Sequence, residues 1–269
     1  MAEQSIWLGR YRQAVRLLMI LFVALAGLGG AALIFGTLFL GTEVSMQTML
    51  RPNGNWLAIF TLWMLLGAIL SSAIYLSDTI GAIEPAPKGP FDILSLICGR
   101  IAMMGVVFVV VIMFYEVVAR YVFEKPTLWA NEFSLWLAGF IFLLAGLYAM
   151  QQRSHIRIYV IYDLMPRWAQ KSADVFSLVL IWGFTLAMIW GGFNEAWDKM
   201  LRWETFGTAW DPPLPGTLKP AILGIILLVA IQALSNLIAD WNETTEGHSP
   251  LDDVDQTEIE NLRRTLESK

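Results

Sequence analysis

Long apolar runs alternate with short polar stretches along the whole chain, and this alternation is the main structural signal in the sequence. A helix needs roughly 20 apolar residues to cross the hydrocarbon core of a bilayer, where no backbone polar group can be left unpaired. Six runs meet that length: residues 17–40, 56–76, 93–123, 133–150, 175–197 and 218–237. The pattern therefore predicts an all-α integral membrane protein with six transmembrane helices.

The polar stretch between the third and fourth runs contains a helix-start signal. Pro126 disfavours continuation of the upstream helix, and Thr127 is a good N-cap residue. Trp129, Phe133 and Leu137 then fall on one helical stripe. We therefore expect a short interfacial helix between spans three and four.

The basic residues bear on the first run and on orientation. Arg10, Arg12 and Arg16 precede residues 17–40, as the basic flank precedes a signal peptide, but this run exceeds the roughly 7–15-residue apolar core of such peptides. We interpret it as a retained span. Lys and Arg are slightly more frequent in the loops on the N-terminal side, and residues 153–171 form the densest basic loop. Both termini are predicted to be cytoplasmic.

Three regions are predicted along the chain. A proline-rich stretch, residues 78–90, separates a two-span N-terminal extension (residues 1–84) from a four-span unit (residues 85–241). The tail, residues 242–269, accounts for the whole net charge of −5. Its apolar positions follow helical spacing, so it is either an amphipathic acidic helix or a segment that is disordered until bound. Anionic headgroups would repel it, and protein is therefore the better partner for its apolar stripe.

Composition excludes several classes of protein. Hydrophobic residues make up 57% of the chain and charged residues 15%, which is too apolar for a soluble domain. One cysteine, Cys98, and two histidines, His155 and His248, exclude an intrachain disulfide framework and make a metal or haem centre improbable. Nothing in the sequence supports nucleic-acid binding, a catalytic set of residues or a bound cofactor, and no span carries the buried polar residues of a sodium or substrate site. We expect a protein that is not an enzyme.

Two charged and aromatic clusters bracket residues 133–150. The first runs from Arg120 to Glu132. Glu116, just before it, shares a helix face with Arg120, either as an interfacial ion pair or as a contact to a partner subunit. Trp129 is either a bilayer anchor or a binding residue, and Glu132 follows it. The second cluster is Arg153-Ser154-His155-Ile156-Arg157, in which His155 fits a polar contact to a headgroup or partner better than a metal site.

Two further features each allow two interpretations. Arg100 lies at the start of the third run, where it either marks the membrane surface or faces a partner or a water cavity. Residues 199–220 carry several prolines and two tryptophans. They form either a cover over the helix ends or a contact surface for a soluble partner.

Residues 93–241 resemble the small permease (Q) subunit of tripartite ATP-independent periplasmic (TRAP) transporters. The resemblance is carried in order by Arg120-Tyr121-Val122-Phe123, then Trp129 and Glu132, then Arg153-Ser154-His155-Ile156-Arg157-Ile158, then Tyr162-Asp163-Leu164-Met165-Pro166. It implies four spans and an interfacial helix, with a large permease subunit that carries substrate and sodium by an elevator movement. It also implies a periplasmic binding protein that delivers the substrate, often an organic acid.

The resemblance further implies a non-catalytic scaffold subunit in the bacterial inner membrane. Six residues are then expected to serve subunit contact or membrane anchoring: Arg120, Trp129, Glu132, Arg153, His155 and Arg157. Two departures leave an alternative open. Tyr159 stands where members usually have an acidic residue, and the extra spans and the tail exceed the family pattern. The alternative is an accessory subunit with this fold recruited into another membrane complex, respiratory or photosynthetic.

Overall fold

The computed structural model describes residues 5–42, 44–52, 54–79, 81, 84–152, 162 and 165–241, and these contain helices and no strand. Six of the helices are long and apolar enough to cross a membrane, which confirms the predicted fold class and number of spans. The elements are η1 (Gly9–Tyr11), α1 (Arg12–Phe39), α2 (Met46–Leu50), α3 (Trp56–Ser77), α4 (Pro90–Tyr121), α5 (Trp129–Gln151), α7 (Arg167–Leu201) and α8 (Leu214–Asp240).

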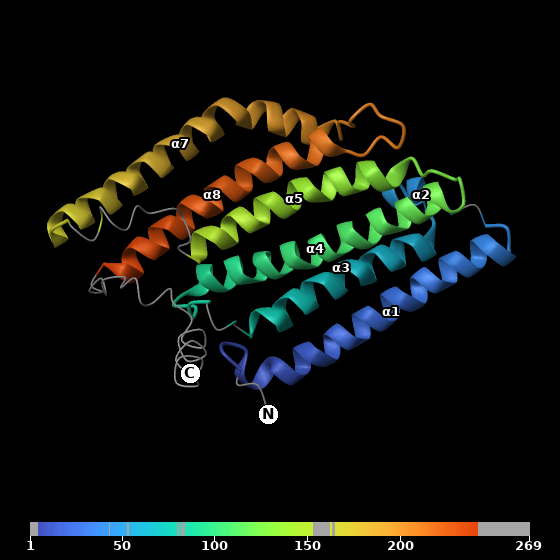
Figure 1. Cartoon of the computed structure of the whole chain (residues 1–269), viewed down its shortest axis with the longest axis horizontal. Coiled ribbons are helices and arrows are strands. Elements are labelled where there is room, and N and C mark those ends of the chain that lie inside the picture. The colour runs from blue at the N-terminus through green and yellow to red at the C-terminus, as the bar shows by residue number, and fades with distance from the viewer. Residues whose placement is uncertain are drawn as a thin grey trace, which may run out of the picture.

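The six long helices lie side by side in the order α1, α3, α4, α5, α8, α7 (Figure 1). Neighbours along this row run in opposite directions, except that α5 and α8 run parallel to each other, and the ends of the helices lie at two ends of the molecule. We call the end that holds the start of α1 and the start of α4 the N-terminal surface. The other end, which holds the α4–α5 loop and the α7–α8 loop, is the opposite surface.

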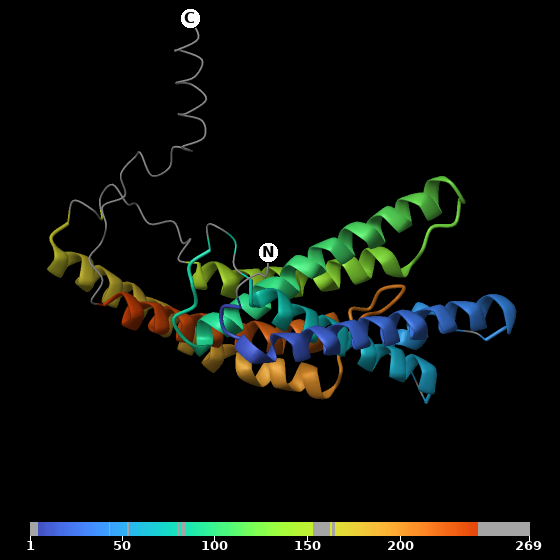
Figure 2. The same ribbon diagram turned by 90° about the horizontal axis from the view of Figure 1, so that it is seen from below.

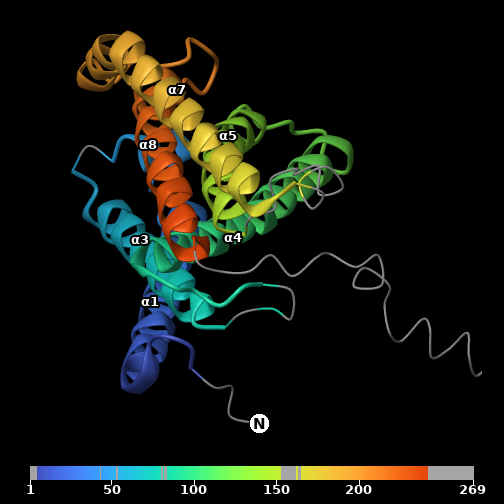
Figure 3. The same ribbon diagram turned by 90° about the vertical axis from the view of Figure 1, so that its left-hand side faces the viewer.

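The helices cross at an angle to one another and do not form a flat layer. Seen from below, α4 and α5 rise away from their neighbours towards the loop that joins them (Figure 2). Seen end on, the helices fan out in different directions (Figure 3). The α4–α5 loop therefore projects out of the row of helices on one side.

Small residues bring the helices into contact. A Cβ built on Gly29 of α1 would lie 2.5 Å from Thr61 Oγ1 of α3, and one built on Gly99 of α4 would lie 2.5 Å from Cδ2 of Tyr148 on α5. Large apolar side chains mostly face outward, where lipid replaces water, so packing between the spans depends on close approach of the backbones.

Most observed helices are longer than the predicted apolar runs. Helix α7 covers Arg167–Leu201, whereas the sequence predicted residues 175–197, because polar residues continue the helix beyond the apolar stretch at both ends. Helix α4 begins at Pro90, where proline is tolerated at the first helical position, and the Asp92 carboxylate accepts a hydrogen bond from the Lys88 backbone N–H at 2.8 Å.

The predicted interfacial helix between spans three and four is wrong in its details. Residues 122–128 contain no helix, and Trp129 begins α5 itself, after Leu128. Thr127 is not the N-cap, because its side chain is used elsewhere, as described below. The short helix that does occur is α2, between the first two spans, where Ser45 and Thr48 form a capping box. The proposed boundary at residue 84 stays a prediction.

Candidate functional site

At the opposite surface, the Glu116 carboxylate joins the end of α4 to the loop that follows it. Its Oε1 accepts hydrogen bonds from Arg120 Nη2 at 2.5 Å and Nε at 3.1 Å. Its Oε2 accepts from the Thr127 backbone N–H at 3.1 Å and from the Thr127 hydroxyl. The predicted pair of Glu116 and Arg120 is confirmed, but the carboxylate also holds the α4–α5 loop against α4.

The two charges of this pair differ in exposure. The Glu116 side chain is 4% exposed, whereas the Arg120 side chain is 49% exposed. Glu116 is therefore committed to contacts within the chain, whereas about half of the Arg120 side chain is left for water, a lipid headgroup or another protein.

Trp129 packs within the chain. Its ring stacks on Tyr115 of α4, with centroids 5.9 Å apart, and lies edge-on to Phe133 at 6.5 Å. Phe133 in turn contacts Trp136 and Trp210, so an aromatic row connects the α4–α5 loop with the α7–α8 loop.

Glu132 holds the α7–α8 loop. Its Oε2 accepts hydrogen bonds from the Thr208 hydroxyl at 2.6 Å and from the backbone N–H groups of Trp210 and Asp211, both at 3.2 Å. Asp211 has a φ of 58°, in the left-handed region that non-glycine residues rarely adopt. A carboxylate that binds successive N–H groups stabilises such a turn. This part of residues 199–220 therefore covers the helix ends.

The structure thus brings Arg120, Trp129 and Glu132 to one end of the molecule. Arg153, His155 and Arg157, also singled out from the sequence, lie outside the described residues, and so do Tyr159 and the tail. For all six predicted site residues, a contact with another subunit stays a prediction.

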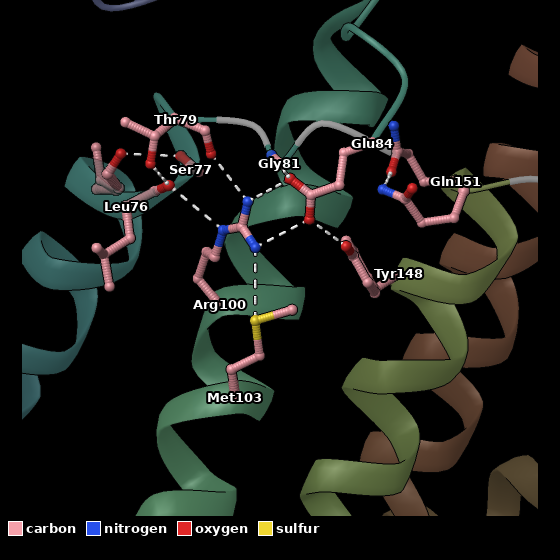
Figure 4. Close-up of polar contacts among 11 residues, drawn as sticks. Leu76, Ser77, Thr79, Gly81, Glu84, Arg100, Met103, Tyr148 and Gln151 are labelled. Atoms are coloured by element: carbon pink, nitrogen blue, oxygen red, sulfur yellow. Dashed lines mark hydrogen bonds and ion pairs between the residues drawn. The ribbon is translucent and has the colours of Figure 1, made fainter. Parts of the chain in front are cut away.

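At the N-terminal surface, a second cluster joins three helices and the linker between them (Figure 4). Arg100 of α4 forms a two-pronged ion pair with Glu84 of the linker, Nη1 to Oε1 at 3.0 Å and Nη2 to Oε2 at 2.6 Å. The same guanidinium donates to the backbone carbonyls of Leu76 at 3.3 Å and Thr79 at 2.9 Å, where α3 ends. The Tyr148 hydroxyl of α5 donates to Glu84. We call Glu84, Arg100 and Tyr148 the junction cluster.

The electrostatics of the junction cluster favour the charged form of Glu84. Burial alone would raise the pKa of this carboxyl, but hydrogen bonds from Arg100 and Tyr148 outweigh it, and the pKa is lowered from its ordinary value. Both members of the ion pair are nearly buried, with side-chain exposures of 13% for Arg100 and 12% for Glu84. From the sequence, Arg100 was noted at the start of its span, but Glu84 and Tyr148 were not identified as its partners.

Asp78 fixes the N-terminal segment to the end of α3. Its Oδ1 accepts hydrogen bonds from the backbone N–H groups of Ile6, Trp7 and Leu8 at 2.9–3.0 Å, and Arg12 lies 3.5 Å from Oδ2. Burial would raise the pKa of Asp78, but these backbone N–H donors outweigh it and lower the pKa. The start of α1 is therefore tied to the same region as the junction cluster.

A buried set of polar side chains connects α4, α5 and α8 near this surface. Gln232 of α8 accepts from Ser95 at 3.0 Å and donates to Asp92 at 2.6 Å and to Asn236 at 2.9 Å. Asn236 donates to the Met150 carbonyl of α5 at 2.7 Å. In a low-dielectric interior such a satisfied network fixes the relative position of the helices.

The hydrogen bonds and ion pairs of these clusters hold helices and loops in place. Their charged groups bind other groups of the same chain at the helix ends. No group of three or more metal-ligating side chains occurs among the residues that the structure describes.

Comparison with known proteins gives one match. The family model described as "Tripartite ATP-independent periplasmic transporters, DctQ component" matches residues 109–243, half of the chain. The matched segment runs from the middle of α4 through α5 and α7 to the end of α8. Neither the curated proteins nor the solved structures contain a match to this chain.

Proposed function

Because this chain belongs to the DctQ family of tripartite ATP-independent periplasmic transporters, we propose that it is a non-catalytic scaffold subunit of a sodium-coupled transporter for small organic acids. It would pair with a large permease subunit, which carries substrate and sodium, and with a periplasmic binding protein. The family match is the observation that carries this proposal, since it covers the second part of α4 and all of α5, α7 and α8 as a continuous segment.

The contacts of the described residues support a static role. The ion pairs of Glu84 with Arg100 and of Glu116 with Arg120 lie near the ends of helices, and each also holds a loop or linker in place. Such arrangements stabilise one position of the helices, which suits a scaffold around a moving partner.

The location follows from the same proposal. The chain would lie in the bacterial inner membrane with the N-terminal surface on the cytoplasmic side. The opposite surface, with the α4–α5 and α7–α8 loops, would then face the periplasm and the binding protein. Arg120 is the best-placed residue for a subunit contact because half of its side chain is exposed. Arg153, His155 and Arg157 would serve subunit contact or membrane anchoring on the cytoplasmic side.

A second candidate role is an accessory subunit in another membrane complex, respiratory or photosynthetic. The observation that favours it is the attachment of helices that the family model does not match: Arg100 joins the end of α3 to α4, and Asp78 joins the start of α1 to the end of α3. These helices add a large apolar face to the membrane-embedded surface. Fold alone does not fix function, and a rigid scaffold can be reused.

Transport in liposomes tests the first role. The chain would be reconstituted with the large permease that co-purifies with it and with the binding protein, and uptake of a panel of small carboxylates measured. We expect uptake that follows an inward sodium gradient and disappears when this chain is left out. Equal uptake without the chain, or uptake indifferent to sodium, would contradict the proposal.

Charge reversal at Arg120 tests the contact. Arg120→Glu should reduce the amount of large permease recovered with the chain, whereas Arg51→Glu, an exposed arginine before α3, should not. Glu116→Gln separates the loss of a contact to the permease from a disturbed fold. It breaks the internal ion pair of Glu116 with Arg120, as Arg120→Glu does, but keeps the arginine. If Glu116→Gln lowers recovery as much as Arg120→Glu, the effect comes from the loop and not from a contact at Arg120.

A further inference from the structure

A groove opens between α7 and α8 at the N-terminal surface, outside the clusters described above. The start of α7 and the end of α8 diverge there (Figure 1). The cavity between them has a volume of about 390 Å³, and its lining is Lys171, Ser172, Val175, Phe176, Val179 and Trp241.

The groove has a polar mouth and an apolar floor. Lys171 and Ser172 lie closest to the start of α7, and Val175, Phe176 and Val179 follow at helical spacing towards the membrane interior. The apolar members are open to the surroundings, with exposures of 63% for Phe176 and 60% for Val179. A ligand that enters from the side would therefore meet a charge near the membrane surface and apolar side chains beneath it.

The Lys171 ammonium is held at the mouth by an aromatic ring. Its Nζ lies 4.6 Å from the centroid of the Trp241 ring, a cation–π contact. Two carboxylates next to the residues of this contact have other partners. Asp174, three residues after Lys171, accepts a hydrogen bond from Tyr162 at 2.7 Å, and Asp240, next to Trp241, lies 3.8 Å from Lys88. In the described part of the chain no ion pair joins Lys171 to a carboxylate, so its N–H donors can serve an external anion.

We propose that this groove binds an anionic phospholipid, with its phosphate on Lys171 and one acyl chain along Val175, Phe176 and Val179. Basic pockets between membrane helices are suited to anionic headgroups. A zwitterionic headgroup fits less well, because its own ammonium would lie close to Lys171 and to Arg167 one turn away. The apolar floor gives an acyl chain no advantage over bulk lipid, so selectivity comes from the charge-assisted contact at Lys171.

Native mass spectrometry of the full chain, extracted with its partners in mild detergent and titrated with lipid, tests this site. Wild type should retain one phosphatidylglycerol in preference to phosphatidylethanolamine. Lys171→Gln should lower phosphatidylglycerol retention about tenfold, as expected for the loss of one hydrogen bond to a charged group. Val179→Trp, which fills the floor, should lower retention of the same lipid while leaving Lys171 intact. Lys125→Gln, an exposed lysine at the opposite surface, should retain lipid like wild type.

Equal retention of the two lipids by wild type, or unchanged retention in both groove variants, would overturn the proposal. Replacing Val175 with a photo-cross-linking amino acid identifies independently the molecule that occupies the groove. Cross-linking to lipid supports the site, whereas cross-linking to another subunit or to the tail of this chain would show that protein covers the groove and would overturn it.

Discussion

At the scale of single residues, Arg100 shows how a charge is accommodated within a membrane helix. A buried arginine is costly unless its charge and its fork of N–H donors are matched. Glu84 balances the charge of Arg100, and the backbone carbonyls of Leu76 and Thr79 accept further hydrogen bonds from its guanidinium. The same bonds join α3, the linker and α4. The need of the Arg100 guanidinium for hydrogen-bond acceptors therefore helps to determine how α3 is attached to α4.

Glu84→Gln should destabilise the chain at neutral pH by about 1.5–3 kcal/mol, the range for hydrogen bonds to charged groups. Because the pKa of Glu84 is lowered in the folded state, its stabilising contribution is present above the unfolded pKa and is lost as the pH falls through the lowered value. The difference in thermal stability between wild type and Glu84→Gln in detergent should therefore be constant through neutral and mildly acidic pH and shrink only in strong acid.

Glu124→Gln is the matched control, since Glu124 is exposed in the α4–α5 loop, and its melting curve should follow wild type at every pH. A stability difference for Glu84→Gln that already vanishes near neutral pH would contradict the assignment of Glu84 as a charged partner of Arg100.

At the scale of elements, the position of the α7–α8 loop at the opposite surface depends on one carboxylate. Glu132→Gln removes the charge that binds Thr208, Trp210 and Asp211. We expect hydrogen exchange at the Trp210 and Asp211 amides to rise about tenfold or more, since a charged hydrogen bond contributes roughly 1.5–3 kcal/mol. The α1 amides should not change. Unaltered exchange at both loop amides would show that Glu132 does not hold this loop.

The contact between α1 and α3 depends on the absence of a side chain at Gly29. A Cβ there would lie 2.5 Å from Thr61 Oγ1, and this hydroxyl is already bonded to the Leu57 carbonyl at 2.7 Å. Gly29→Leu should force the helices apart and destabilise the chain by about 1–3 kcal/mol, as overpacking does.

Gly27→Leu is the control for that prediction, because a Cβ at Gly27 meets nothing within 4 Å. It should leave the melting temperature unchanged or raise it slightly, since leucine favours helix more than glycine does. Equal destabilisation by both substitutions would indicate a general loss of helix or membrane fit and would contradict the close approach at Gly29.

At the scale of the whole molecule, apolar run length was enough to predict the six spans, because lipid selects for continuous helices and leaves few alternatives. The start of α5 could not be predicted in the same way. Thr127 has the side chain of an N-cap, but Glu116 of α4 uses its hydroxyl, and that contact exists only once the two helices pack. Local propensity was overridden by tertiary structure.

The candidate site was predictable to a similar extent. The sequence placed Arg120, Trp129 and Glu132 at one membrane surface, and they do lie together there. It could not show that Glu132 binds a loop more than 70 residues away, nor that Arg100 pairs with a glutamate in a proline-rich linker. Such partners depend on which helices become neighbours, and no periodicity in a single sequence encodes that.

The partners that surround the whole molecule in its native membrane decide whether it is a transporter subunit. The chain would be isolated from native membranes in mild detergent, and everything retained quantified by mass spectrometry. We expect one large multi-span permease in near-equal amount. Recovery of a respiratory or photosynthetic complex, with no such permease, would contradict the transporter role and favour the second one.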